Sequence, residues 1–267
     1  MTHPTSAHAQ PATLLYWAVI GHYRYWLAFD GIERHRLECQ GNRLDAPAVR
    51  RIGIEYKVNR GVYQKADAQP ARKATGKSAA RRAKDAREDG APRLAVLINE
   101  GADAGWDTWD LRQRAERCAE IAKAAADNGA TRGRLASAVS KLMWFIRPRG
   151  WTLYDDLSAN ATVVAGRNTV EEMLAFYCAL QERGFAECAA EINRRFASSA
   201  LRELYGERVI DKFFLLHGQS ADERADSLAV LEVFLSILLP CVAQALDVTA
   251  RDIDAACASE ARRLLRP

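Results

Sequence analysis

The chain has 267 residues, of which 49% are hydrophobic and 27% are charged, a composition that is ordinary for a folded protein. A chain of this length can bury a core large enough to fold without disulfides or a structural metal. Its net charge of only +4 does not by itself indicate a nucleic-acid-binding protein, so the distribution of charge along the chain is more informative than the total.

The N-terminal part of the chain has two pieces of different composition. The first dozen residues lack the basic and apolar regions of a secretory signal, and we expect residues 1–13 to form a disordered tail. Residues 14–63 are dense in aromatic and aliphatic side chains and are predicted to be the N-terminal part of a helical fold. One helical face would carry Tyr16, Ile20, Tyr23 and Leu27. The stretch RRIGIEYKVNRGVY fits either a strand or a helix, so a small amount of β-structure is allowed here.

Residues 64–93 form a segment without a large apolar side chain, with nine Lys/Arg against four acidic residues. This composition is typical of a solvated, flexible linker, and the excess of positive charge also fits an arm that contacts phosphates. The segment includes ATGKS, but Ala71 stands where a P-loop requires its first glycine, and no apolar strand precedes it. Nucleotide binding is therefore not predicted for this segment.

The remainder of the chain, residues 94–267, is predicted to be a helical body. Apolar periodicity indicates helices over Leu111–Asp127 and Leu135–Phe145, and a motif similar to a capping box, Asn168–Glu171, precedes a helix that ends at Gly184. Further helices are expected at roughly 185–204, 206–217, 222–239 and 249–265, the last with Thr249 as its N-cap. Because little period-2 alternation is present, the protein is predicted to be mainly α.

The most apolar segment, Leu228–Leu239, is too short to cross a membrane. A spanning helix needs about 20 apolar residues, and this segment is shorter and contains Glu232. The six cysteines are scattered without a C-x-x-C pair, and the five histidines are isolated. We therefore expect a soluble, cytoplasmic protein with reduced thiols, no metal site and no cofactor.

One stretch, SKLMWFIRPRGWTLYDDLSANA over residues 140–161, departs from regular helix. An apolar helix that carries Lys141 meets a Pro/Gly break, and Asp155 and Asp156 then stand at the head of a second helix. Lys141 and Asp155 are fourteen positions apart, so a chain reversal between them could return both side chains to the same end of a cleft. Taken singly, Lys141 also fits an exposed lysine near a helix start, and both aspartates fit simple N-caps.

The pattern S-K-L-x-x-F-x-x-P followed by Y-D-D-x-x-A resembles a segment of helix-hairpin-helix DNA glycosylases of the 8-oxoguanine glycosylase-like type. Residues 207–218 are similar to a later helix in divergent bacterial members of that group, and the likeness covers roughly residues 130–218. The resemblance implies a multi-helix globular fold that binds DNA and excises a damaged or modified base. A role in genome repair and a role in defence against foreign modified DNA, such as that of a phage, both fit it.

The resemblance also implies catalytic roles. Asp155, with Asp156 as the neighbouring alternative, would stabilise positive charge that develops on the sugar when the N-glycosidic bond breaks. Lys141 would attack the anomeric carbon and form a Schiff base, which would add lyase activity.

Two further groups would bind the nucleic acid. Aromatic side chains would receive an extruded base, although aromatic residues at helical spacing also fit a core; they are Trp144, Phe145 and Trp151. Arginines around the segment would bind phosphates on either side of the flipped nucleotide, and they also fit a solvated surface; they are Arg132, Arg134, Arg147 and Arg149. Asp211, Lys212 and His217 could form a secondary cluster, with Asp211 expected to pair with a neighbouring arginine.

A non-catalytic protein is the alternative that the sequence keeps open. It would be a helical module on a glycosylase-like scaffold that binds nucleic acid or another protein. Exposure of Leu228–Leu239 as an apolar stripe would favour the protein-interaction form of this alternative, whereas burial of the segment would make it part of the core.

Overall fold

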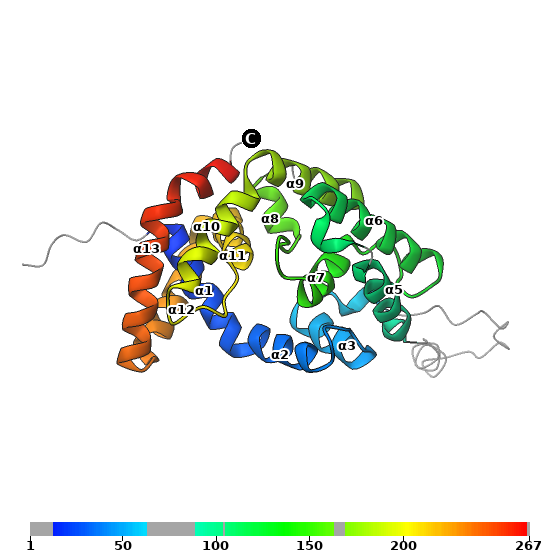
Figure 1. Ribbon diagram of the computed structural model, residues 1–267, viewed down its shortest axis with the longest axis horizontal. Coiled ribbons are helices and arrows are strands. Elements are labelled where there is room, and N and C mark those ends of the chain that lie inside the picture. Colours follow the sequence, from blue (N-terminus) through cyan, green and yellow to red (C-terminus); the bar gives the residue numbers. More distant parts are fainter. Residues whose placement is uncertain (1–12, 63–88, 104, 163–168, 266–267) are drawn as a thin grey trace, which may run out of the picture.

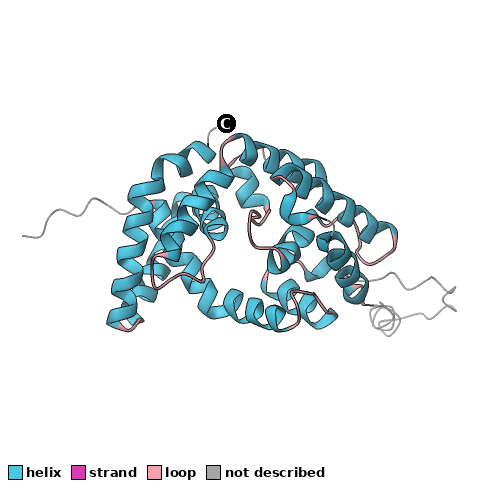
Figure 2. Cartoon of the chain, in the orientation of Figure 1, coloured by secondary structure: helices cyan, strands magenta, loops and turns pink. Residues whose placement is uncertain are grey.

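The computed structural model describes residues 13–62, 89–103, 105–162 and 169–265 (Figure 1). Within these residues the chain forms helices and short connections and no strand, as Figure 2 shows. The prediction of a mainly α, multi-helix globular protein is confirmed. The stretch for which the sequence allowed a strand or a helix forms a helix over Ala46–Glu55, so no β-structure is found in the described N-terminal part.

In chain order the helices divide into N-terminal, central and C-terminal sets. The N-terminal helices are α1 (Leu14–Tyr25), α2 (Gly31–Cys39) and α3 (Ala46–Glu55), with a π-helical turn, Trp26–Asp30, between the first two. The central helices are α5 (Ala91–Asp103), α6 (Leu111–Asp127), α7 (Ala136–Ile146) and α8 (Asp156–Asn160). The C-terminal helices are α9 (Val170–Glu182), α10 (Phe185–Ala197), α11 (Gly206–Gly218), α12 (Ala221–Ile237) and α13 (Pro240–Leu264).

The helices gather in two groups at opposite ends of the long axis (Figure 1). In one group α1 packs against α11, α12 and α13, and α10 packs against α11 and α13. In the other group α5 packs against α3, α6 and α7. The short helix α8 contacts α11 of the first group, and it also contacts α9, which packs against α6 of the second group. It therefore lies where the two groups meet. Buried side chains from both groups form one continuous hydrophobic core.

The ends of the predicted segments differ in part from the structure. The predicted tail, apart from Thr13, and most of the predicted basic linker lie outside the described residues. Thr13 caps α1, since its hydroxyl accepts a hydrogen bond from the Leu15 amide at 3.2 Å. Because α5 begins at Ala91, the last three residues of the predicted linker are helical.

Helix starts account for the other differences. The capping box before α9 lies one residue later than predicted, and it joins Thr169 to Glu172. The last helix begins at Pro240, a residue favoured in a first turn, instead of at Thr249. The Thr249 hydroxyl donates to the Ala245 carbonyl at 2.9 Å, which satisfies this polar side chain in the middle of α13. No helix in the described part of the chain is long and apolar enough to span a membrane.

Candidate functional site

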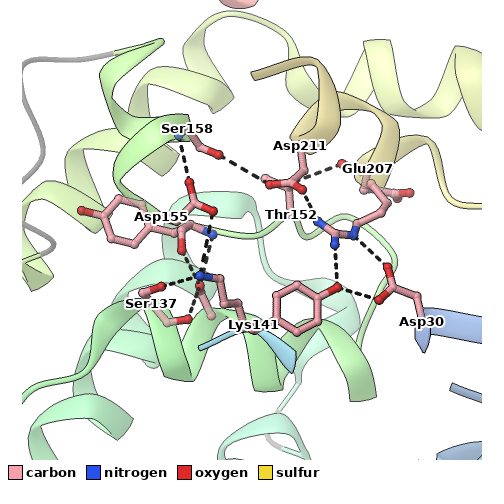
Figure 3. A network of polar contacts seen from close by, with 12 residues as sticks. Asp30, Ser137, Lys141, Thr152, Asp155, Ser158, Glu207 and Asp211 are labelled. Carbon is pink, nitrogen blue, oxygen red and sulfur yellow. Dashed lines mark hydrogen bonds and ion pairs between the residues drawn. The ribbon is translucent and has the colours of Figure 1, made fainter. Parts of the chain in front are cut away.

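The candidate site is centred on Lys141, which lies on α7 and is only 6% exposed. Its Nζ atom donates a hydrogen bond to the Ser137 hydroxyl, one turn earlier on the same helix, at 2.8 Å. The same Nζ lies 3.9 Å from Oδ2 of Asp155 (Figure 3). The predicted proximity of Lys141 and Asp155 is therefore confirmed, and Ser137 is an additional member of the pair's surroundings.

Ser140 holds the chain reversal that brings the two residues together. Its backbone carbonyl accepts from the Trp151 indole at 2.9 Å, and its hydroxyl accepts from the Tyr154 amide at 3.1 Å. The segment after the Pro/Gly break is thereby fastened back onto α7. Asp155 follows in extended backbone and caps α8, because its Oδ1 accepts from the Ser158 amide at 3.0 Å. One carboxylate thus caps a helix and faces an amine.

The reversing segment is also tied to α9 and α11. The Tyr177 hydroxyl donates to the Thr152 carbonyl at 2.8 Å, and the Thr152 hydroxyl donates to the Glu207 carbonyl at 3.0 Å. The Gly150 amide donates to the Glu207 carboxylate at 2.8 Å. These bonds come from two other helices, so the position of Asp155 relative to α7 is fixed by the surrounding fold.

Burial determines the protonation chemistry of the pair. Loss of hydration lowers the pKa of Lys141, while the nearby carboxylates of Asp155 and Asp211 act in the opposite direction. Partial burial and the Asp155 carboxylate raise the pKa of Asp156, whose side chain lies on the exposed side of α8. Asp155, not Asp156, is therefore the carboxylate beside the amine, and the amine is easier to deprotonate than a solvated lysine.

A buried polar network continues from Asp155 across the molecule (Figure 3). The Ser158 hydroxyl lies 3.5 Å from Asp211, which pairs with Arg208. Arg208 also pairs with Asp30 at 3.1 Å, and the Tyr56 hydroxyl donates to Asp30 at 2.6 Å. The expected pairing of Asp211 with a neighbouring arginine is confirmed. The sequence offered the spacing of three between Arg208 and Asp211, but nothing in it indicated Asp30 as the second partner.

The predicted base-pocket aromatics lie in the core. All three rings are fully buried; they are Trp144, Phe145 and Trp151. Trp144 and Phe145 lie on α7, which is buried on every face, and Trp151 lies in the segment after the Pro/Gly break. Trp151 stacks on Tyr177 with 4.1 Å between ring centroids, and Phe145 packs edge-on against Tyr56. In this structure the rings make core contacts, and their role in a base pocket stays a prediction.

Two of the predicted phosphate-binding arginines are held by protein groups. The Arg149 guanidinium lies 4.6 Å from the centre of the Tyr205 ring and donates to the Asn193 side chain at 2.6 Å. The Arg147 guanidinium donates to the Ala102 carbonyl at 3.3 Å. Arg149 remains exposed, whereas Arg147 is partly buried, so Arg149 is the better placed of the two to meet a ligand.

The other two arginines lie just before α7, the helix that carries Lys141. Arg132 and Arg134 are exposed in the connection between α6 and α7. Arg134 lines a shallow pocket of about 210 Å³ together with Lys57 and Ser137. Because Ser137 also bonds Lys141, this basic pocket borders the candidate pair. The other predicted cluster does not form around Asp211, since His217 points to the exposed side of α11.

The described residues contain no group of three His, Cys, Asp or Glu side chains that could hold a metal ion. The site's chemical resources are therefore an amine, a carboxylate, hydroxyls and neighbouring guanidinium groups. Comparisons of the chain with family models, with curated proteins and with solved structures give no match.

Proposed function

We propose that this protein binds DNA and uses Lys141 and Asp155 to cleave the N-glycosidic bond of a damaged or modified nucleotide. The observation that carries the proposal is the 3.9 Å separation between the Lys141 amine and the Asp155 carboxylate, in a place where burial favours the neutral amine. The resemblance of the lysine–turn–aspartate segment to helix-hairpin-helix DNA glycosylases supports the choice of substrate.

The two groups have complementary parts in this chemistry. The neutral Lys141 amine attacks C1′ of the sugar, the bond from C1′ to the base breaks, and the base leaves with the electron pair and takes a proton from water. The Asp155 carboxylate stabilises the positive charge that spreads over C1′ and the ring oxygen in the transition state. The attached nitrogen then loses a proton to water. Opening of the sugar ring yields a protonated imine, and the ring oxygen takes up a proton.

The basic pocket beside the pair is suited to the sugar-phosphate backbone. Arg134 and Lys57 line this pocket, and the exposed Arg132 lies two residues before Arg134 in the same connection. Contacts from such side chains position a nucleic acid without reading its sequence, and their affinity falls as salt rises. DNA held at this pocket would lie next to the Ser137 hydroxyl that bonds the Lys141 amine.

The test is base release from duplexes that carry different damaged or modified bases. We expect wild-type protein to release one class of base, and Asp155→Asn to lower the rate by about 10²–10³-fold because the transition-state charge loses its stabiliser. Lys123→Gln removes an exposed lysine on α6 and should retain the wild-type rate. Salt-sensitive binding to DNA without release of any base would contradict the proposal and favour a non-catalytic binding module.

A second candidate function, docking of another protein, is favoured by the surface of α12. Val233 is 61% exposed and Ile237 is 74% exposed, whereas Leu231 is the only buried residue of this helix. The segment that the sequence marked as most apolar therefore presents part of its apolar surface outward. Ile237→Glu should remove a docked protein from complexes isolated from the native cell and leave DNA binding unchanged. Retention of the same partner by the variant would reject this candidate.

A further inference from the structure

A second buried lysine, Lys212 on α11, lies on the wall of a pocket of about 500 Å³. The pocket lies among α1, α11 and α12, and Leu157 from α8 completes it. Five aliphatic side chains contribute to its wall, among them Leu216 and Leu231. The pocket is thus large enough for a small organic molecule and suited to one with an apolar body.

Within the described part of the chain, the buried amine of Lys212 lacks the hydrogen bonds and ion pairs that usually accompany a buried amine. The residue is 5% exposed, and its Nζ lies 3.5 Å from the centre of the Tyr25 ring. Among the described residues it makes no hydrogen bond or ion pair, because the adjacent Asp211 is paired with Arg208. An unpaired amine that faces a pocket is available to a ligand.

The surroundings of Lys212 favour its uncharged form. Burial, reinforced by the neighbouring Arg208 guanidinium, lowers the pKa of Lys212 to about 7, although Asp211, Asp30 and Asp155 act in the opposite direction. A large fraction of this amine is therefore neutral near pH 7, and the neutral amine is the nucleophilic form.

The charge of the pocket argues against an anionic ligand. Its other two charged lining residues, Arg24 and Asp226, have opposite signs and offset each other. An anion would have to give up its hydration to an aliphatic wall without a fixed positive partner, which is costly. A neutral, electrophilic ligand fits both the wall and the amine.

We infer that this pocket binds a small aldehyde with an apolar body, which condenses with Lys212. The Nζ atom adds to the carbonyl carbon, and one proton moves from nitrogen to the carbonyl oxygen. Transfer of a second proton lets the oxygen leave as water, and a carbon–nitrogen double bond remains. The step needs no oxidant or reductant and is reversible. It does not rest on the proposed DNA chemistry, because Lys212 and Lys141 are separate amines.

The test is reductive labelling of the intact protein with hexanal and cyanoborohydride near pH 7, followed by peptide mapping in a mass spectrometer. We expect Lys212 to be alkylated about 10- to 100-fold faster than the exposed Lys123. Labelling of Lys212 no faster than that of Lys123, or preferential labelling of Lys141, would overturn the inference.

A pair of tryptophan variants separates pocket binding from general reactivity. Val230 lines the pocket at its exposed rim, so Val230→Trp should fill the opening and reduce labelling of Lys212 to the level of Lys123. Val248→Trp places the same side chain at an exposed site on α13 outside the pocket lining and should leave labelling of Lys212 unchanged. Both variants keep Lys212 and change exposed positions. Equal labelling in the two variants would also overturn the inference.

Discussion

Two lysines, Lys141 on α7 and Lys212 on α11, are buried, and their partners distinguish them. Lys141 bonds Ser137 and faces the Asp155 carboxylate, whereas Lys212 faces the Tyr25 ring and an aliphatic pocket. Burial lowers the pKa of both amines. An amine beside a carboxylate suits a reaction that builds positive charge, while an amine in an apolar pocket suits capture of a neutral electrophile.

The lowered pKa of Lys212 predicts a pH-dependent stability. Between about 7 and about 10.5 the unfolded chain carries a proton on this lysine that the folded chain has lost, so the free energy of unfolding should rise with pH. The slope from this one group is at most about 1.4 kcal/mol per pH unit. In Lys212→Met the free energy of unfolding should rise less with pH, because this lysine no longer contributes. Urea unfolding of both proteins at several pH values measures the difference. Parallel curves for the two proteins would show that Lys212 does not have a lowered pKa.

The proximity of Lys141 and Asp155 could be predicted from the sequence, whereas the position of Lys212 beside a pocket could not. A lysine, a Pro/Gly break and an aspartate within one short stretch predict a reversal that places the two side chains together. The position of Lys212 depends on α1 and α12, whose contacts with α11 cannot be deduced from the residues around it. The full burial of Trp144 and Phe145 could not be derived for a similar reason, because it depends on the elements that cover α7 on all sides.

At the level of elements, α8 is short and depends on its first residue. Its Asp155 carboxylate satisfies the Ser158 amide, and the helix has little length over which to recover a lost cap. The same side chain is the carboxylate of the candidate site. The capping role of Asp155 and its proposed catalytic role can therefore be separated by comparing a substitution that removes only its charge with one that removes both its charge and its cap.

Asp155→Asn keeps a good N-cap without the charge, and Asp155→Ala removes both. We expect Asn to change the free energy of unfolding by less than about 0.5 kcal/mol, and Ala to lower it by about 1 kcal/mol. Both should lose base release. Asp110→Ala removes the cap of α6, far along the chain from the pair, and should cost similar stability while leaving activity intact. If Asp155→Asn released base at the wild-type rate, Asp155 would be only a cap.

Helix interiors were more predictable from the sequence than helix boundaries. The interiors of α6, α7 and α9 follow from apolar periodicity, and α6 has the predicted bounds. Prediction of α13 gave its start too late, because a threonine inside a helix resembles an N-cap until its bond to the preceding turn is known. Local patterns identify what a residue can do, and tertiary packing decides which option it takes.

At the level of the whole molecule, Arg208 joins segments that are far apart in sequence. It pairs with Asp211 on its own helix and with Asp30 at the end of the π-helical turn. All three side chains are buried, and the network continues through Ser158 to the candidate site. The periodicity that predicted each helix contains no information about this long-range pairing, so the assembly of the helices could not be derived from the sequence.

Removal of Arg208 should therefore destabilise the whole fold. Arg208→Leu leaves two buried carboxylates without their cation, and we expect the free energy of unfolding to fall by about 3–5 kcal/mol. Arg194→Ala removes an exposed arginine that pairs with Glu191 and should cost less than about 1 kcal/mol. Thermal or urea unfolding of both variants measures the difference. Equal losses would show that the buried network contributes no more than a surface ion pair.

The proposal that Lys141 acts as a nucleophile beside Asp155 is tested most directly by borohydride trapping on a duplex that carries an abasic site. This substrate does not depend on the identity of the excised base, and the adduct can be mapped to one lysine by mass spectrometry. We predict a covalent adduct at Lys141 that is absent in Lys141→Gln and retained in Lys212→Gln. An adduct at another lysine, or none from a duplex that the protein binds, would contradict the account.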